Sequence, residues 1–176
     1  MQYGVNLRLG YTIMTEEEIK ARDESTSNTI KIYTGWSAGA ALLPVPLVDL
    51  AAVTSVQIKM VADLAKIYEV PFSRNAVKTI IVSLLGSVLP ATLARGLSSL
   101  IKAIPGVGSA LGALTAPVFT TASTYAVGKV FVKHFEMGGN LLDFDTEAMR
   151  GYFKEEFETA AASEKSAGKS QSKAAA

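Results

Sequence analysis

The sequence predicts an all-α protein: a helical bundle built around a hydrophobic helical hairpin rich in Gly, Ala, Ser and Thr, with flanking amphipathic helices. Three observations lead to this fold class. Apolar residues recur at helical spacing over residues 47–68 and again over residues 146–161. Residues 79–94 and 109–128 carry no charge, and a Pro-Gly turn lies between them. Hydrophobic residues make up 49% of the chain and the mean hydropathy is +0.27, which leaves both a membrane-associated and a soluble bundle open.

Residues 1–28 are expected to form an N-terminal extension and a charged linker outside the main domain. Residues 1–13 precede a second methionine, Met14, and lack the pattern of a signal peptide. Thr15 and Glu18 have the spacing of a capping box, so the charged stretch up to Asn28 is expected to be a short solvated helix or a linker. A single helical domain is expected over residues 29–161, followed by a disordered Ser/Lys/Ala tail over residues 162–176.

An apolar segment, residues 30–43, is the first helix expected inside the domain. Pro44 and Pro46 end it, because proline cannot continue the backbone hydrogen-bond ladder. Gly35 and Gly39 have the spacing that lets two helices approach closely in lipid, although a Gly-rich helix in a soluble core would show the same spacing. An amphipathic helix over residues 47–68 follows, with its charges opposite its apolar face.

The central hairpin is expected to consist of helices near residues 75–102 and 109–128, joined by a turn at Pro105 and Gly106. Residues 109–128 match the roughly 20 residues that a spanning helix requires. Small residues line one side of each helix, which predicts close packing of the two. They are Thr79, Ser83, Ser87 and Ala91 on the first helix, and Gly108, Ser109, Gly112, Ala116, Thr120 and Ser123 on the second.

Charge is segregated along the chain. No acidic residue lies between Glu69 and Glu136, whereas that block holds the basic residues Arg74, Lys78, Arg95, Lys102, Lys129 and Lys133. Attraction to anionic lipid or to an acidic partner is the simplest use of such a block. Arg74, Lys78, Lys129 and Lys133 lie at the base of the expected hairpin, so the positive-inside tendency places that base on the cytoplasmic side of a membrane. A ring of lysines around a soluble core in the cytoplasm is the alternative.

The C-terminal part is expected to hold a further amphipathic helix. Gly138 and Gly139 should end the preceding helix, and Asp145 should cap a helix over residues 146–161. Met149, Phe153 and Phe157 recur at i, i+4 and i+8, which predicts one buried face.

Residues that would carry enzymatic or metal chemistry do not form a recognisable constellation. The chain has no cysteine and a single histidine, His134. Gly168, Lys169 and Ser170 imitate the end of a phosphate-binding loop, but Ser163 stands where that motif needs its first glycine. The sequence therefore predicts no catalytic residue, no cofactor and no metal site, and it contains no nucleic-acid-binding module.

Residues 35–73 resemble the opening of an uncharacterised bacterial domain family that is often fused to, or encoded near, Era-like small GTPases. The resemblance extends over about residues 30–136. It rests on a helix over residues 57–68 and on two turns, one at Pro44, Pro46 and Asp49 and one at Pro105, Gly106 and Gly108. It implies an all-helical, membrane-associated domain with a small GTPase as partner in trans, because the chain carries no GTPase domain of its own.

The sequence thus favours a membrane-associated helical module that tethers or regulates a partner at the cytoplasmic side of the bacterial inner membrane, where it contacts anionic lipid. Two alternatives stay open. One is a soluble structural bundle or homo-oligomer that packs through its glycine faces. The other is a membrane-active protein of pore-forming type, whose hairpin inserts on demand.

Overall fold

A computed structural model describes residues 8–9, 12–40, 48–88 and 116–174. Within these ranges the protein is a bundle of helices α1 (Glu16–Ala40), α2 (Val48–Ile67), α3 (Arg74–Val88), α6 (Ala116–Glu136) and α7 (Thr146–Ala174). A short ribbon precedes them, in which β1 (Arg8–Leu9) pairs antiparallel with β2 (Thr12–Ile13). The predicted all-α bundle is confirmed.

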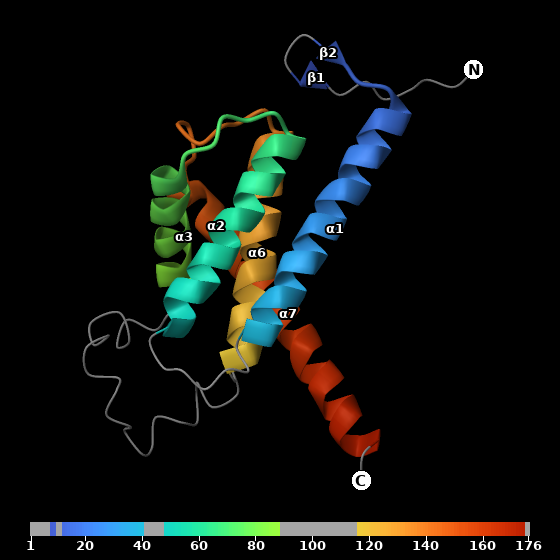
Figure 1. Cartoon of the computed structure of the whole chain (residues 1–176), viewed down its shortest axis with the longest axis vertical. Coiled ribbons are helices and arrows are strands. Elements are labelled where there is room, and N and C mark those ends of the chain that lie inside the picture. The colour runs from blue at the N-terminus through green and yellow to red at the C-terminus, as the bar shows by residue number, and fades with distance from the viewer. Residues whose placement is uncertain (1–7, 10–11, 41–47, 89–115, 175–176) are drawn as a thin grey trace.

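Helix α6 lies at the centre of the bundle (Figure 1). It packs against α1, α2 and α7, whereas α3 lies mainly against α2 and α7. The connections α2–α3 and α6–α7 lie at one end of the bundle, which we call the loop end. At the opposite end, α1 and α3 finish while α2 and α6 begin.

The core is formed by aromatic and branched side chains on the facing sides of the helices. Phe131, Phe135 and Phe153 are fully buried. Phe157 of α7 meets Phe119 of α6 edge to face, with ring centroids 5.5 Å apart. Each such burial stabilises the fold by about 1.5–3 kcal/mol. The buried face predicted for the C-terminal helix is therefore confirmed, and it holds the first half of α7 against the bundle.

A buried polar seam joins α1, α2 and α6. Gln57 is completely buried, and its Nε2 donates to Ser123 Oγ at 3.4 Å and to Thr124 Oγ1 at 3.3 Å. Thr124 Oγ1 donates in turn to Ser37 Oγ at 2.9 Å. Because buried polar groups are costly without partners, this seam restricts how the three helices slide past one another.

Two predicted helix starts are confirmed by their caps. Thr15 N donates to Glu18 Oε2 at 2.7 Å, and Glu18 N donates to Thr15 Oγ1 at 3.2 Å, which is a complete capping box. At the start of α7, Asp145 Oδ1 accepts from the backbone N–H groups of Glu147 and Ala148 at 2.9 and 3.1 Å.

The predicted boundary between a linker and the domain at residues 28 and 29 is wrong. Helix α1 runs without a break through this point. Thr26 is buried and donates at 3.5 Å to Oη of Tyr68, the residue that follows α2, and Ile30 and Tyr33 continue the same buried face. Charged residues cover the outer side of the first half of α1. Because they are so frequent there, the few buried positions between them were not recognised in the sequence.

The C-terminal tail also differs from the prediction. Residues 162–174 are helical rather than disordered, because α7 continues to Ala174. The segment contains alanine and lysine, which favour helix, and no proline. Adding turns to an existing helix avoids the cost of nucleation, so the packed first half of α7 supports the second.

Most of the expected hairpin lies outside the described residues, including Pro105, Gly106, Gly108 and Gly112. The part of its first helix that is described, α3, does not turn its small residues to α6. Thr79 and Ser87 are exposed, and the buried face consists of larger side chains such as Val77, Ile81 and Leu84. Close packing of the two small faces is therefore wrong over α3, because burying the larger apolar side chains stabilises the fold more.

Candidate functional site

The charges of four helices are segregated along the axis of the bundle. The halves that lie towards the end opposite the loop end carry no charge over residues 32–40 of α1, 50–58 of α2, 79–88 of α3 and 116–128 of α6. We call this the charge-free end; Asp49, in the first turn of α2, is the exception in these four helices.

The first charged residue beyond the charge-free half is a lysine in each of these helices. These residues, which we call the lysine girdle, are Lys31 of α1, Lys59 of α2, Lys78 of α3 and Lys129 of α6. At 1.5 Å per residue they lie about 14–20 Å from the helix ends. The fold thus brings lysines that are far apart in the chain to similar distances from the same end of the bundle.

Helix α1 exposes an apolar face within its charge-free half. The side chains of Ile32 and Trp36 are 54% and 58% exposed, and Trp36 contacts the ring of Tyr33 edge-on. Gly35 and Gly39 lie on the same outer side and would meet no other atom within 4 Å of an added Cβ. The predicted role of these glycines in helix packing is therefore not seen among the described residues.

The close helix approach is made by a glycine that the sequence prediction missed. A Cβ at Gly128 would lie 2.8 Å from Cγ1 of Ile30, so α6 reaches α1 at this point because it has no side chain there. Gly128 belongs to no Gly-x-x-x-Gly pair, since position 124 is Thr and position 132 is Val. Only the tertiary arrangement identifies it.

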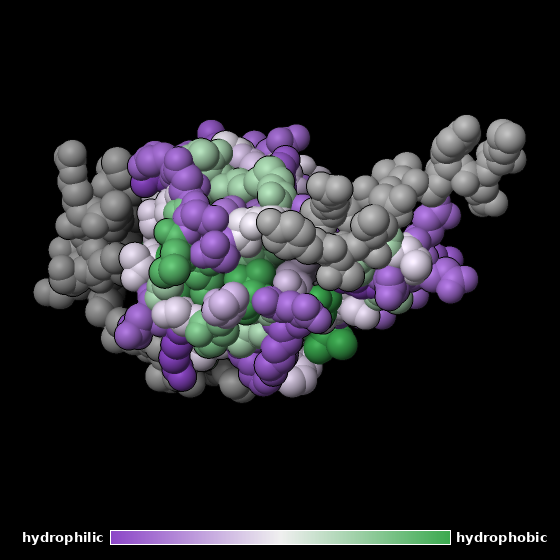
Figure 2. Space-filling view, turned by 90° about the horizontal axis from the view of Figure 1, so that it is seen from above, coloured by the Kyte–Doolittle hydropathy of each residue, from purple (hydrophilic) through white to green (hydrophobic). Residues whose placement is uncertain are grey.

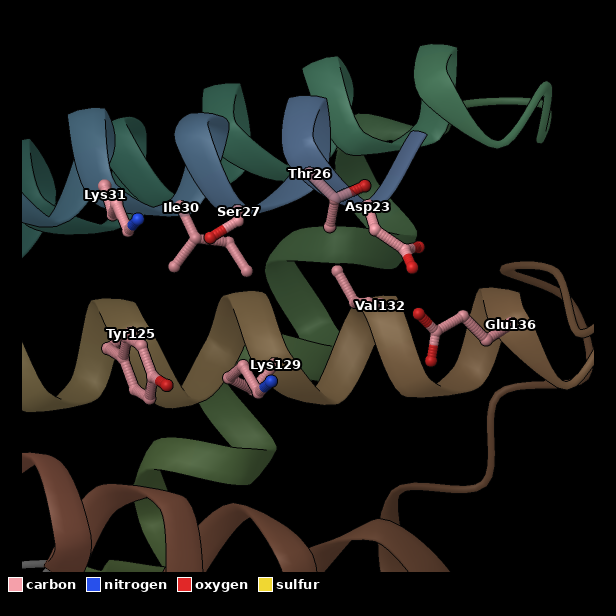
Figure 3. A pocket seen from close by; sticks show the side chains of 9 residues that line it. All are labelled: Asp23, Thr26, Ser27, Ile30, Lys31, Tyr125, Lys129, Val132 and Glu136. Atoms are coloured by element: carbon pink, nitrogen blue, oxygen red, sulfur yellow. The ribbon is translucent and has the colours of Figure 1, made fainter. Parts of the chain in front are cut away.

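A groove lined by both polar and apolar residues lies between α1 and α6 on the side of this approach (Figure 3). Its volume is 260 Å³, and its middle is lined by Thr26, Ile30, Val132 and the hydroxyl of Ser27. The acidic and basic residues lie in different halves of it. Asp23 faces Glu136 at the end nearer the loops, Lys31 lies across from Tyr125 at the other end, and Lys129 lies between Tyr125 and Val132.

The acidic end of the groove is held by Tyr68, which follows the last residue of α2. The Tyr68 hydroxyl donates to Glu136 Oε1 at 3.2 Å, and the Arg22 guanidinium lies 5.0 Å from the centre of the Tyr68 ring. Burial, above all, raises the pKa of Tyr68 to about 12, so this hydroxyl stays a donor near neutral pH. Glu136 is thereby fixed at the rim of the groove.

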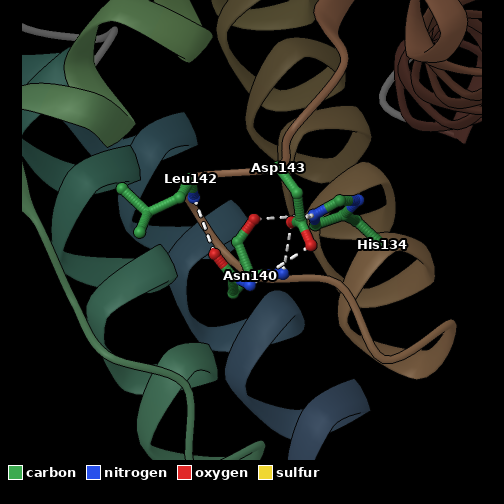
Figure 4. A network of polar contacts seen from close by, with 4 residues as sticks. All are labelled: His134, Asn140, Leu142 and Asp143. Carbon is green, nitrogen blue, oxygen red and sulfur yellow. Dashed lines mark hydrogen bonds and ion pairs between the residues drawn. The ribbon is translucent and has the colours of Figure 1, made fainter.

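His134 occupies a different site, at the last turn of α6 (Figure 4). Its Nε2 lies 2.8 Å from the Asn140 carbonyl oxygen and 3.1 Å from Asp143 Oδ1. The backbone N–H of Asn140, and secondarily His134, lower the pKa of Asp143. With a φ of +81°, Gly138 ends the helix as predicted, and Gly139 N donates to the His134 carbonyl oxygen at 3.0 Å. The cluster fixes the α6–α7 connection.

The loop end carries a second group of exposed apolar side chains. Phe72 is 42% exposed, Met137 is 63% exposed and Leu142 is 95% exposed. Viewed onto this end, the molecule shows apolar surface between hydrophilic side chains (Figure 2). Glu69, Asp143 and Asp145 lie exposed on the same two connections, so this surface differs in charge from the lysine girdle.

The structure separates the four basic residues expected at the hairpin base. Arg74 and Lys78 are exposed on α3, and Lys129 lines the groove with α1. The Lys133 ammonium lies 4.0 Å from the ring centre of Tyr152 on α7. Of the small residues expected in helix packing, Ser123 is buried beside Gln57, and Ala116 begins α6. The turn residues Pro44 and Pro46 lie outside the described residues.

None of the helices in the described part of the chain combines the length and the apolar character that crossing a bilayer requires. In the same part of the chain, no group of three or more His, Cys, Asp or Glu residues is placed to hold a metal ion.

Comparison with known proteins identifies the family. The model of a bacterial domain of unknown function, DUF697, matches residues 11–161. A protein of Magnetospirillum gryphiswaldense named magnetosome membrane protein 22 is 42% identical over 138 residues, which are 78% of this chain and 71% of that protein. No solved structure matches the chain significantly. The chain therefore belongs to the DUF697 family, whose members share a domain of unknown function.

Proposed function

We propose that this protein is a membrane-associated helical module that approaches the bilayer with its charge-free end. The observation that carries the proposal is the axial segregation of charge, in which four uncharged helix halves are bounded by the lysine girdle. Lysine stems lie along apolar surface while their ammonium groups stay in the headgroup region. A band of lysines at one level therefore suits the boundary between a bilayer and water.

The α1 side of the bundle is the side that meets the lipid. Trp36 and Ile32 are exposed there, and tryptophan is favoured at membrane interfaces. Helix α7, by contrast, carries acidic residues near the charge-free end. Phe157 contacts Phe119 near the start of α6, so its neighbours Glu155, Glu156 and Glu158 lie near the charge-free end. These carboxylates, and the charged second half of α7 that projects beyond the bundle at this end (Figure 1), require the molecule to tilt so that its α1 side, and not its α7 side, meets the bilayer.

The relative's name supports the same proposal, since a protein 42% identical to this one is named a membrane protein. The lysine girdle favours the cytoplasmic face of a bacterial inner membrane, because that leaflet attracts basic residues. With this orientation the loop end points into the cytoplasm. Its exposed Phe72, Met137 and Leu142 then offer an apolar surface through which the module tethers or regulates a partner. The resemblance to domains found with Era-like GTPases makes a small GTPase the partner to test first.

Flotation of the full chain with lipid vesicles tests the proposal. Ile32→Asp with Trp36→Asp places two charges on the α1 face without removing buried groups, because both side chains are more than half exposed. An aspartate inside the apolar region costs about 2.5 kcal/mol or more. The double variant should therefore float at least about tenfold less than the wild type.

The matched control places aspartates at the other end of the molecule. Met137→Asp with Leu142→Asp also replaces two exposed apolar residues, and it should float like the wild type. Equal flotation of the wild type and both variants would reject the α1 face as the contact. Failure of the wild type to float would favour a soluble bundle, and release of a trapped dye by the wild type would favour the pore-forming alternative.

A further inference from the structure

We propose that the groove between α1 and α6 binds a phosphate ester, with the phosphate between Lys31 and Lys129 and the alcohol towards Ser27 and Asp23. This inference rests on the proposed function and names the lipid chemistry that the module recognises. The same headgroup chemistry exists in a membrane phosphodiester such as phosphatidylglycerol and in a free glycerol phosphate.

The basic end of the groove has the composition of an anion site. Lys31 and Lys129 come from different helices and line the same cavity, and neither forms an ion pair within the described part of the chain. Two ammonium groups that face one cavity repel each other, and an anion bound between them turns repulsion into attraction. Tyr125 lines the groove across from Lys31.

The rest of the groove suits a hydroxylated alcohol. Ser27 lies one helical turn from Lys31, a rise of about 6 Å, and it places a hydroxyl beside a group attached to the bound phosphate. Asp23 lies one turn further on and accepts hydrogen bonds from the alcohol. Asp23 and Glu136 repel a second anionic group, which favours a ligand with one phosphate and a neutral head over a polyphosphate.

The size and position of the groove match a headgroup. Its 260 Å³ is below the roughly 300–1,000 Å³ of sites for drug-sized molecules, so it holds a headgroup and leaves acyl chains outside. Lys31 is followed directly by Ile32, and Gly35 lies one turn beyond it. The basic end therefore adjoins the apolar face of α1, where acyl chains of a bound lipid would continue into the bilayer.

Binding to vesicles of phosphatidylcholine, with and without phosphatidylglycerol, tests the site. The double variant Lys31→Gln with Lys129→Gln replaces both charged groups by shorter neutral polar side chains. Each lysine at an anionic surface contributes about fivefold in affinity, so binding to the phosphatidylglycerol vesicles should fall about 25-fold. Residual binding to pure phosphatidylcholine should not change, because the apolar face of α1 stays intact.

The matched control, Lys20→Gln with Arg74→Gln, removes the same charge from the loop-end halves of α1 and α3, where both side chains are exposed and lie outside the lysine girdle. It should lose less than about fivefold. Equal losses in the two double variants would overturn the groove site and leave general attraction of the basic surface, while the proposed membrane association would still stand. The groove site would also be overturned if the double variant Lys31→Gln with Lys129→Gln bound these vesicles as well as the wild type does.

Titration of the full chain with free glycerol phosphate separates the two sources of the ligand. Saturable binding that Lys31→Gln with Lys129→Gln abolishes would support the site with a soluble ligand. Loss of vesicle binding in that variant, without any response of the wild type to glycerol phosphate, would support the site with a lipid headgroup as its source.

Discussion

At the scale of single residues, Gly139 packs so closely against the His134 ring that a side chain at this position would not fit. A Cβ added at this position would lie 2.4 Å from Cε1 and Nε2 of the His134 ring. That ring is held by Asn140 and Asp143, so it cannot retreat without losing those contacts. Gly139→Ala should therefore lower the free energy of unfolding by about 1–3 kcal/mol, measured by urea denaturation.

Gly151→Ala is the control for that change, because the site of its Cβ has no atom within 4 Å and lies on an exposed part of α7. Replacing a glycine in a helix interior by alanine should raise stability by about 0.5–1 kcal/mol. Equal effects of the two substitutions, in either direction, would contradict the tight packing of His134 on Gly139.

The sequence predicted those residue roles that depend on near neighbours in the chain. Thr15 with Glu18, Gly138 and Asp145 all act within a few residues of their own position, and all of these roles are confirmed. Gly128 and the groove could not be predicted in this way. The partners of Gly128 are Ile30 and Met60, which are far away in the sequence, so its role follows only from how α1, α2 and α6 pack.

At the scale of elements, helix α7 combines two halves of different character. Met149, Phe153 and Phe157 are buried in the first half, whereas Ala162, Ser163 and Glu164 are exposed and the C-terminal end projects beyond the bundle (Figure 1). The sequence predicted the packed half correctly, because apolar periodicity reports burial. The sequence did not predict that the projecting half is helical, because that half has no periodic apolar residues.

Deletion of residues 162–176 should leave the stability of the bundle almost unchanged. Few of the groups removed are packed against the core, so the free energy of unfolding should stay within about 0.5 kcal/mol, while the helical signal in circular dichroism falls. Phe157→Ala in the full chain serves as the comparison, and it should cost about 3–5 kcal/mol. A large loss on deletion would mean that the second half of α7 also supports the fold.

At the scale of the whole molecule, the sequence indicated how charge is segregated but not where the segregated parts meet. The acid-free block between Glu69 and Glu136 was visible in the chain. The contribution of α1 was not, since Lys31 and the uncharged residues 32–40 lie outside that block. Only the antiparallel packing of α1 on α6 brings Lys31 and Lys129 to one groove, and it joins the α1 and α6 members of the lysine girdle.

Trp36 makes the orientation of the whole molecule on a membrane directly measurable, because it is the single tryptophan of the chain. Its side chain is 58% exposed in the free protein, so its fluorescence should shift to shorter wavelength when vesicles containing phosphatidylglycerol are added. If the lysine girdle lies at the headgroups, Trp36 lies just inside the acyl region, since it is five residues, or about 7–8 Å of helix, beyond Lys31. Lipids brominated near the headgroup should then quench it more strongly than lipids brominated near the chain ends. Vesicle binding without any change in Trp36 fluorescence would place the contact elsewhere, and the exposed apolar group at the loop end would become the surface to test.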